Sequence, residues 1–139
     1  MTRALVDTSA WIDFYHPRGS PEVKRLVTQA LEDGEVAVTA PVVAELLAGA
    51  RTEEENRTLQ EGLQSLHVLP LAWEEGVTAG RLAQALARTG RRVPVVDLLI
   101  AAAAHSHGYE IWHAGDEHYA AIAAAGGPPE RNLRPAARR

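Results

Sequence analysis

Residues 4–12 carry the stretch that decides the fold, Ala4-Leu5-Val6-Asp7-Thr8-Ser9-Ala10-Trp11-Ile12. The apolar run before Asp7 is typical of a short strand that is buried on both faces, as in a parallel sheet. The run ends in an acid and two hydroxyls, and a helix-compatible segment follows. In open parallel sheets, ligands bind just beyond the carboxyl ends of the strands. Two interpretations are open: Asp7, Thr8 and Ser9 line a site for chemistry, or one of them only caps the next helix.

The rest of the chain alternates short apolar runs with longer segments of helical periodicity. The pattern predicts strands at residues 4–6, 36–38, 67–71 and 110–113, with a weak fifth strand at 132–134. It predicts helices at residues 9–15, 20–34, 42–50, 52–66, 73–89, 97–107 and 116–125. Strands that alternate with helices form right-handed βαβ units. We therefore expect one α/β domain over residues 1–139, with a parallel sheet of four to five strands covered on both faces.

The composition is that of a globular protein, with 46% hydrophobic and 23% charged residues. No apolar run approaches the ~20 residues of a membrane-spanning helix, and we expect neither a membrane segment nor a secretion signal. The absence of cysteine fits a cytoplasmic protein. A net charge of −4 gives no overall signature of a nucleic-acid binder. Arginines do gather locally, in a pair and in a C-terminal cluster interpreted as a solvated tail: Arg91, Arg92, Arg131, Arg134, Arg138 and Arg139.

Three of the 18 acidic residues lie among apolar neighbours. Asp7 follows an apolar strand, Glu45 lies between Val-Val-Ala and Leu-Leu, and Asp97 lies between Val-Val and Leu-Leu-Ile. A buried, unpaired carboxylate is costly, so it protonates, pairs with a cation or binds a metal. Cationic partners are scarce, because Lys24 is the only lysine and no arginine lies within four residues of Glu45 or Asp97. All three acids are expected just after strands or in the first turns of the helices that follow, at the ligand-binding edge of the sheet.

Asp116 is a fourth candidate, because it follows the strand at 110–113 and begins a predicted helix. Each acid also has a purely structural interpretation: Asp97 and Asp116 as helix caps, and Glu45 as a side chain at an exposed helix edge. Two carboxylates 4 Å apart repel by roughly 4 kcal/mol at an effective dielectric of 20, so a cluster requires protons or a hard cation. Oxygen ligands favour Mg²⁺ or Mn²⁺. Such ions commonly bind substrate phosphate, which points to phosphodiester chemistry.

Four segments, in this order along the chain, resemble the PIN-domain family, and specifically the VapC-type ribonuclease toxins of bacterial toxin–antitoxin pairs. They lie at residues 5–9, 41–46, 97–104 and 111–123, and the resemblance spans nearly the whole chain. It implies a three-layer α/β/α sandwich and a Mg²⁺- or Mn²⁺-dependent endoribonuclease that acts as the toxin. It also implies a homodimer, and a cognate antitoxin whose C-terminal segment wraps the toxin and blocks its site.

Carried over by position, the resemblance predicts an acidic catalytic set of Asp7, Glu45, Asp97 and Asp116. Asp7 and Asp97 would hold the metal most directly, and Thr8 and Ser9 would position substrate or water. Water would then attack an RNA phosphodiester with no covalent enzyme intermediate, while Glu45 or Asp116 orients it or accepts its proton.

The chain departs from the family pattern just before the fourth acid. The family often has Thr or Ser there, whereas this chain has His113-Ala114-Gly115, which leaves the orientation of Asp116 open. We leave His113 and His118 out of the catalytic set, because a lone histidine near a site is more often structural.

Two other functions remain as alternatives. A catalytically silent PIN-like module would use its acids to hold a partner's arginine and would never cut RNA. A Mg²⁺-binding phosphoacceptor domain would need a paired acid after the first strand and a late lysine, but the only lysine is residue 24. A dinucleotide-binding fold would need Gly-x-Gly-x-x-Gly after the first strand, where this chain has Asp-Thr-Ser. The RNA target, the number of metal ions and the identity of the antitoxin are not predicted by the sequence.

Overall fold

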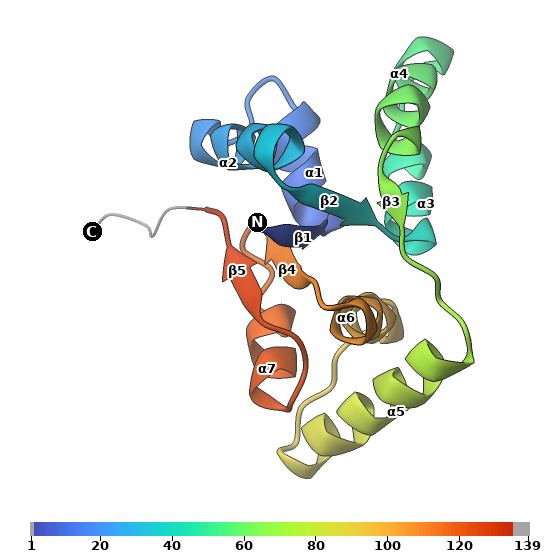
Figure 1. The fold of residues 1–139 in the computed structure, drawn as a ribbon, viewed down its shortest axis with the longest axis vertical. Coiled ribbons are helices and arrows are strands. Elements are labelled where there is room, and N and C mark those ends of the chain that lie inside the picture. Colours follow the sequence, from blue (N-terminus) through green and yellow to red (C-terminus); the bar gives the residue numbers. More distant parts are fainter. Residues whose placement is uncertain (1, 135–139) are drawn as a thin grey trace.

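A five-stranded parallel sheet forms the middle layer of the structure, a computed structural model that describes residues 2–134 (Figure 1). Each neighbouring pair of strands is parallel. In spatial order the strands are β3 (His67–Val68), β2 (Glu35–Val38), β1 (Arg3–Val6), β4 (Glu110–His113) and β5 (Glu130–Asn132). The predicted α/β class and parallel sheet are confirmed.

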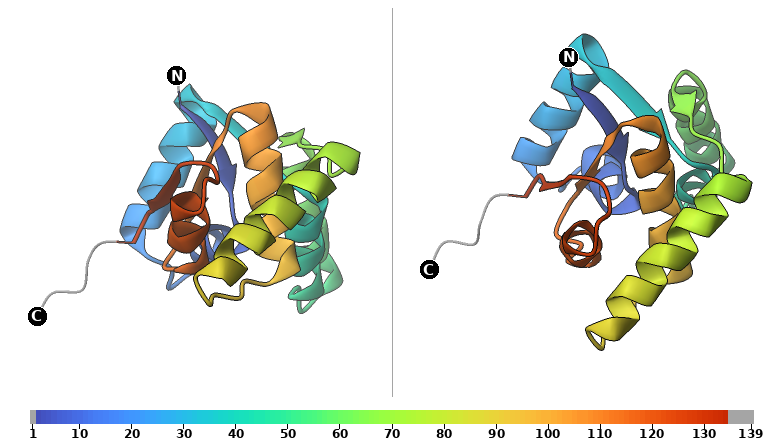
Figure 2. Two further views of the ribbon diagram at one scale, coloured as in Figure 1. Left: turned by 90° about the horizontal axis from the view of Figure 1, so that it is seen from below. Right: turned by 60° about the horizontal axis from the view of Figure 1, so that its bottom comes forward.

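Helices cover both faces of this sheet. The chain runs from β1 to β2 and β3 in one direction, then returns across the sheet to β4 and β5. Because βαβ crossovers are right-handed, this reversal moves the later helices to the opposite face, and the views show α1 and α2 on one side and α5 to α7 on the other (Figure 1; Figure 2). The helices are α1 (Thr8–Tyr15), α2 (Pro21–Asp33), α3 (Ala40–Ala48), α4 (Glu53–Gln64), α5 (Trp73–Arg88), α6 (Val95–His107) and α7 (His118–Ala124). The predicted three-layer α/β/α arrangement is therefore confirmed.

The core lies on both sides of the central strands. Residues 4–6 of β1 have no exposed surface, as expected for a strand with both faces covered. Helix α6 packs against α5, α7 and β4, and its residues 100–104 are completely buried, which explains why this helix is apolar almost all round. Gly108 ends α6 in the left-handed conformation, at φ 73°, where a residue without a Cβ is favoured. This turn leads the chain directly into β4.

Several element boundaries differ from the predicted ones. Helix α6 begins at Val95, with Pro94 at its N-cap position, rather than at Asp97. Helix α7 begins at His118 instead of residue 116, and β5 covers Glu130–Asn132 instead of 132–134. Strand β3 has two residues where five were predicted, because the neighbouring strand β2 ends at Val38, whose carbonyl accepts the N–H of Leu69 at 2.9 Å.

The interpretation of the C-terminal arginines as a solvated tail is wrong for Arg134. Its guanidinium donates to both carboxylate oxygens of Asp13 on α1, at 2.9 and 3.1 Å, and the Asp13 residue is 6% exposed. Arg131 lies over the ring of Trp112 at 5.3 Å. Arg138 and Arg139 lie outside the described residues. No helix within residues 2–134 is long and apolar enough to cross a membrane.

Candidate active site

The predicted site residues gather at the carboxyl edge of the sheet, beside the point where the strand order reverses. Strand β1 lies between β2 and β4, and the connections on its two sides run in opposite directions. Such a switch point leaves a crevice beyond the strand ends. Asp7 directly follows β1, and its N–H donates to the carbonyl of Trp112 on β4 at 2.8 Å. The loop 114–117 follows β4, and α6 begins at the same edge.

Asp7 is held by three hydrogen bonds and is 4% exposed. One carboxylate oxygen accepts from the backbone N–H and the hydroxyl of Ser9, at 3.2 and 2.9 Å. The other oxygen accepts from the hydroxyl of Tyr119 on α7 at 2.8 Å. Asp7 is the N-cap of α1, so the cap interpretation is correct, but the cap uses only one of its oxygens.

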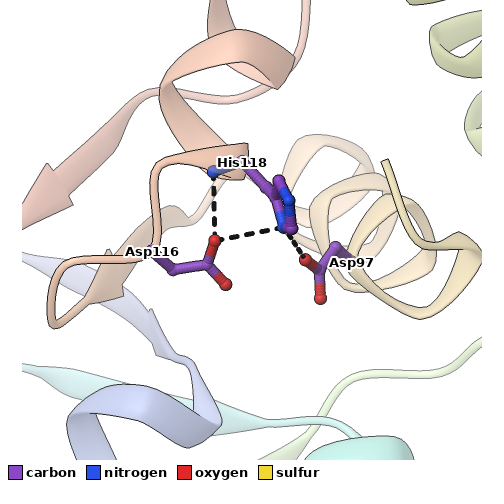
Figure 3. Close-up of side chains that lie close together, drawn as sticks. All are labelled: Asp97, Asp116 and His118. Carbon is purple, nitrogen blue, oxygen red and sulfur yellow. Dashed lines mark hydrogen bonds and ion pairs between the residues drawn. The ribbon is translucent and has the colours of Figure 1, made fainter. Parts of the chain in front are cut away.

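Asp97, Asp116 and His118 form a compact group at this edge (Figure 3). The Nδ1 atom of His118 lies 2.9 Å from a carboxylate oxygen of Asp97 and 3.3 Å from one of Asp116. One ligand atom from each residue lies within 4.8 Å of the others. Asp97 is the third residue of α6, and the helix is capped at Pro94 without a side-chain hydrogen bond. The interpretation of Asp97 as a helix cap is therefore wrong.

Asp116 lies one residue before the N-cap of α7, which is Glu117. Its carboxylate accepts the backbone N–H of His118 at 3.0 Å, so it also supports the start of the helix. The cap interpretation of Asp116 therefore holds in part, although the formal cap position belongs to its neighbour.

The charges of Asp7 and Asp116 act on the carboxyl of Asp97, although the three acids lie far apart in the sequence. Burial raises the pKa of the Asp97 carboxyl, and the negative charges of Asp116 and Asp7 raise it further, while the hydrogen bond from His118 acts in the opposite direction. Burial also raises the pKa of the Tyr119 phenol, with added contributions from the charges of Asp7 and Asp97. The phenol therefore keeps its proton and remains a donor to Asp7.

Glu45 lies on the exposed side of α3 and not in the buried group. One of its carboxylate oxygens accepts from the hydroxyl of Thr8 at 3.2 Å, which links it to the residue next to Asp7. The edge-exposed interpretation of Glu45 is therefore correct. Thr8 contacts Glu45 and Ser9 contacts Asp7, so both hydroxyls organise the acids; their role toward substrate or water stays a prediction.

Two residues outside the predicted set, His118 and Tyr119, also lie at the site. His118 follows Asp116 by two positions, a spacing that does not itself indicate a shared ligand group. Tyr119 is a buried tyrosine in an alanine-rich helix, and only its unexplained polar hydroxyl in that setting could have indicated a contact with an acid. His113, also left out, is 3% exposed and lies behind the site, against Glu130 and the backbone of Asp116.

A groove of about 870 Å³ opens next to Glu45, between α1, α3 and α4. Its lining combines apolar and aromatic side chains with basic and acidic ones, including Tyr15, Arg18, Arg51 and Glu55. Ile12, on the same groove, is 53% exposed. The candidate active site therefore has an open approach on the side of Glu45.

The donor chemistry of the compact group fits a divalent cation. Two carboxylates and one imidazole supply separate ligand atoms within 4.8 Å of one another, and the side chains of Asp97 and Asp116 are 17% and 24% exposed. A partly exposed set of hard oxygen donors with one nitrogen donor suits ions such as Mn²⁺ and Mg²⁺.

Comparison with known proteins gives consistent findings. Residues 4–125 match the family model of the PIN domain. Ribonuclease VapC18 from Mycobacterium tuberculosis is 34% identical over 128 residues, which cover 89% of this chain and 90% of that protein. Ribonuclease VapC11 from the same organism is 37% identical over 116 residues, which cover 78% and 84%.

Solved structures agree in fold. VapBC2 from Rickettsia felis, bound to a DNA fragment from its promoter, has a TM-score of 0.77 at 17% identity and covers 94% of this chain and 98% of that chain. VapBC-5 from Mycobacterium tuberculosis has a TM-score of 0.65 at 26% identity, with coverage of 96% and 99%. Because VapBC2 is only 17% identical to this chain, its similarity is evidence for the fold and for nothing more.

Proposed function

This chain belongs to the PIN-domain family, and from that premise we propose that it is an endoribonuclease that acts as the toxin of a toxin–antitoxin pair. One observation carries the proposal: Asp97, Asp116 and His118 offer ligand atoms within 4.8 Å of one another at the edge of the sheet where Asp7 follows β1. The negative charges of Asp116 and Asp7 act on the Asp97 carboxyl and raise its pKa. Two of the similar proteins are named ribonucleases, which supports the same reaction class for this site.

The proposal includes a divalent cation, Mg²⁺ or Mn²⁺, held by Asp97, Asp116 and His118. The family resemblance predicted Asp7 and Asp97 as the residues that hold the metal most directly. We favour the three-residue group because its members offer ligand atoms within 4.8 Å of one another and the side chains of Asp97 and Asp116 are partly exposed. Asp7 is 4% exposed, and its two oxygens accept three hydrogen bonds from Ser9 and Tyr119. When bound, the cation would stabilise charge on the scissile phosphate and lower the pKa of an attacking water. The imidazole donor favours Mn²⁺ over Mg²⁺.

The other polar residues either hold the acids in position or line the groove through which a substrate would approach. Ser9 fixes Asp7 and accepts the N–H of Ala114 at 3.0 Å, so it ties the ends of β1 and β4 together. Glu45 is exposed beside the groove, where its carboxylate can orient a water or accept its proton. Arg18 and Arg51 line the same groove and can contact RNA phosphates.

The nuclease proposal is tested by cleavage of total bacterial RNA with the purified chain, with new RNA ends mapped by sequencing. We expect cleavage in Mn²⁺ or Mg²⁺, none in a chelator, and a loss of about 100-fold or more in Asp97→Asn and Asp7→Asn. Asp33→Asn, at an exposed position on α2, is the matched control and keeps full activity. A chain that binds its partner normally but never cuts RNA would support the silent binding module instead.

The proposal extends to the partners. Similar structures are described as VapBC assemblies and, for one from Klebsiella pneumoniae, as a toxin–antitoxin complex. We propose that this chain likewise binds a cognate antitoxin, forms a homodimer and acts in the cytoplasm, where its RNA substrate is. Expression of the chain alone is expected to arrest growth, and co-expression of the small protein encoded next to it is expected to restore growth. Growth arrest that the neighbouring protein does not relieve would contradict the antitoxin assignment.

A further inference from the structure

The loop that carries Asp116 is held by side chains rather than by a backbone ladder. Three successive backbone N–H groups each donate to a different side chain: Ala114 to the Ser9 hydroxyl at 3.0 Å, Gly115 to the Asn132 carbonyl oxygen at 2.9 Å, and Asp116 to the His113 Nδ1 atom at 3.1 Å. Gly115 adopts the left-handed conformation at φ 81°, so the chain turns sharply here. The position of Asp116 therefore depends on these three acceptors.

Two of these contacts depend on β5. Asn132 lies on this strand and accepts the Gly115 N–H directly, and it also accepts the N–H of Arg134 at 3.1 Å. Glu130 lies two residues earlier and contacts Nε2 of His113. Residues two apart on a strand project to the same face, so β5 presents both side chains toward the loop 114–116. Backbone pairing of β5 with β4, in the register His113 to Asn132, keeps that face in place.

The geometry fixes the tautomer of His113. The backbone N–H of Asp116 can only donate, so the Nδ1 atom that it contacts must carry a lone pair. The proton of the neutral imidazole then lies on Nε2 and is donated to the carboxylate of Glu130. Because the imidazole is 3% exposed, water does not compete for either nitrogen. Glu130 thus acts on the Asp116 backbone through the ring of His113.

We propose that β5 is a positioning element of the candidate active site: Asn132 directly, and Glu130 through His113, fix the backbone of the loop that carries Asp116. This inference deepens the proposed function and rests on it, since it gives Asp116 a place in the cation-holding group. Some side chains orient a metal-ligating residue without touching the metal. Removing such a side chain typically lowers metal affinity or activity by about 10- to 100-fold. His113 takes the position where the sequence departs from the family pattern, and the proposed role explains what this residue does there.

The tautomer is measured first, by long-range ¹⁵N–¹H correlation of the histidine rings in the full chain at about pH 8, above the ordinary histidine pKa. His113→Asn identifies the His113 signals. We expect a protonated Nε2 and an unprotonated Nδ1 in the wild type and in Glu130→Gln, which keeps an acceptor for Nε2–H. Glu130→Ala removes that acceptor and is expected to broaden or shift this tautomer signature. A His113 ring protonated on Nδ1 in the wild type would overturn the inference, because that atom could not accept the Asp116 N–H.

Cation binding is measured second, as the loss of the free Mn²⁺ signal in electron paramagnetic resonance. We expect Asn132→Ala and Glu130→Ala to weaken Mn²⁺ binding about 10-fold. Asn132→Asp keeps an acceptor oxygen for Gly115 N–H and is expected to restore the affinity. Asn56→Ala and Glu61→Ala, which remove the same side chains on α4, are matched controls. Circular dichroism shows whether each variant is folded, and Asn132 is exposed, so its replacement spares the core.

The outcomes separate this inference from the proposed function on which it rests. If Asp116→Asn weakens Mn²⁺ binding while Asn132→Ala and Glu130→Ala match their controls, the role of β5 is overturned and the cation site stands. If the wild type binds no Mn²⁺, the cation site fails, and the His113 tautomer then decides alone whether β5 fixes the loop.

Discussion

Tyr119→Phe removes one hydroxyl from the molecule and tests how much the fold depends on the charged site. The phenol donates to Asp7 at 2.8 Å, and both residues are buried, at 1% and 4% exposure. A hydrogen bond to a charged group contributes about 1.5–3 kcal/mol, and a buried carboxylate left without its donor loses that amount. We expect Tyr119→Phe to lower the free energy of unfolding by about 2 kcal/mol, or the melting temperature by roughly 8 °C.

Urea unfolding followed by far-UV circular dichroism measures this loss, with the denaturant slope compared between variants. The matched control is Tyr15→Phe, because Tyr15 is half-buried and burial alone raises the pKa of its phenol. In an Asp7→Asn background the acceptor is neutral, and the cost of Tyr119→Phe is expected to fall to about half. A Tyr119→Phe protein as stable as the Tyr15→Phe control would refute the reasoning, as would a cost that does not change in the Asp7→Asn background.

Three further changes test other parts of the fold by the same unfolding measurement. Thr39→Val is expected to stabilise the protein by about 1 kcal/mol, because the Thr39 hydroxyl is completely buried and has no hydrogen-bond partner within residues 2–134; a loss of stability would indicate a buried water there. Gly108→Ala is expected to destabilise it by about 1–2 kcal/mol, since φ is 73°, and an unchanged stability would contradict that strain. Arg134→Ala is expected to cost about 1 kcal/mol, less in high salt, because the Arg134 side chain is 54% exposed; in an Asp13→Asn background the cost should nearly vanish.

The sequence predicted the layers of the fold because both periodicities were clear. Short apolar runs ended in polar residues, and segments such as residues 21–33 repeated apolar side chains at helical spacing. The boundaries were harder to predict, because a helix can begin at exposed residues that carry no periodic signal. Val95 and Val96 are exposed in the first turn of α6, so the apolar pattern that marks this helix starts later than the helix itself.

The depth of each acid could not be predicted from its neighbours along the chain. Glu45 has apolar residues on both sides, yet Val42 and Leu46 take the buried face of α3. Successive helix residues differ by about 100°, which places Glu45 beside that face and not within it. Asp97 has similar neighbours but lies where α6 enters the site, so burial raises its pKa. The difference depends on which face each helix presents to the sheet, and a single sequence does not give that rotation.

Burial and the neighbouring charges raise the pKa of the Asp97 carboxyl, so the charge of this residue opposes folding. A carboxyl whose pKa is higher in the folded than in the unfolded protein weakens folding when it ionises, so stability falls as the pH rises from the ordinary carboxyl pKa to the raised one. Burial is the first cause, and the charges of Asp116 and Asp7 add to it. A neutral asparagine at position 97 would avoid the repulsion from both charges. A cation bound between Asp97 and Asp116 would convert the repulsion into attraction, and the same carboxylates that weaken the free protein would then bind it more tightly.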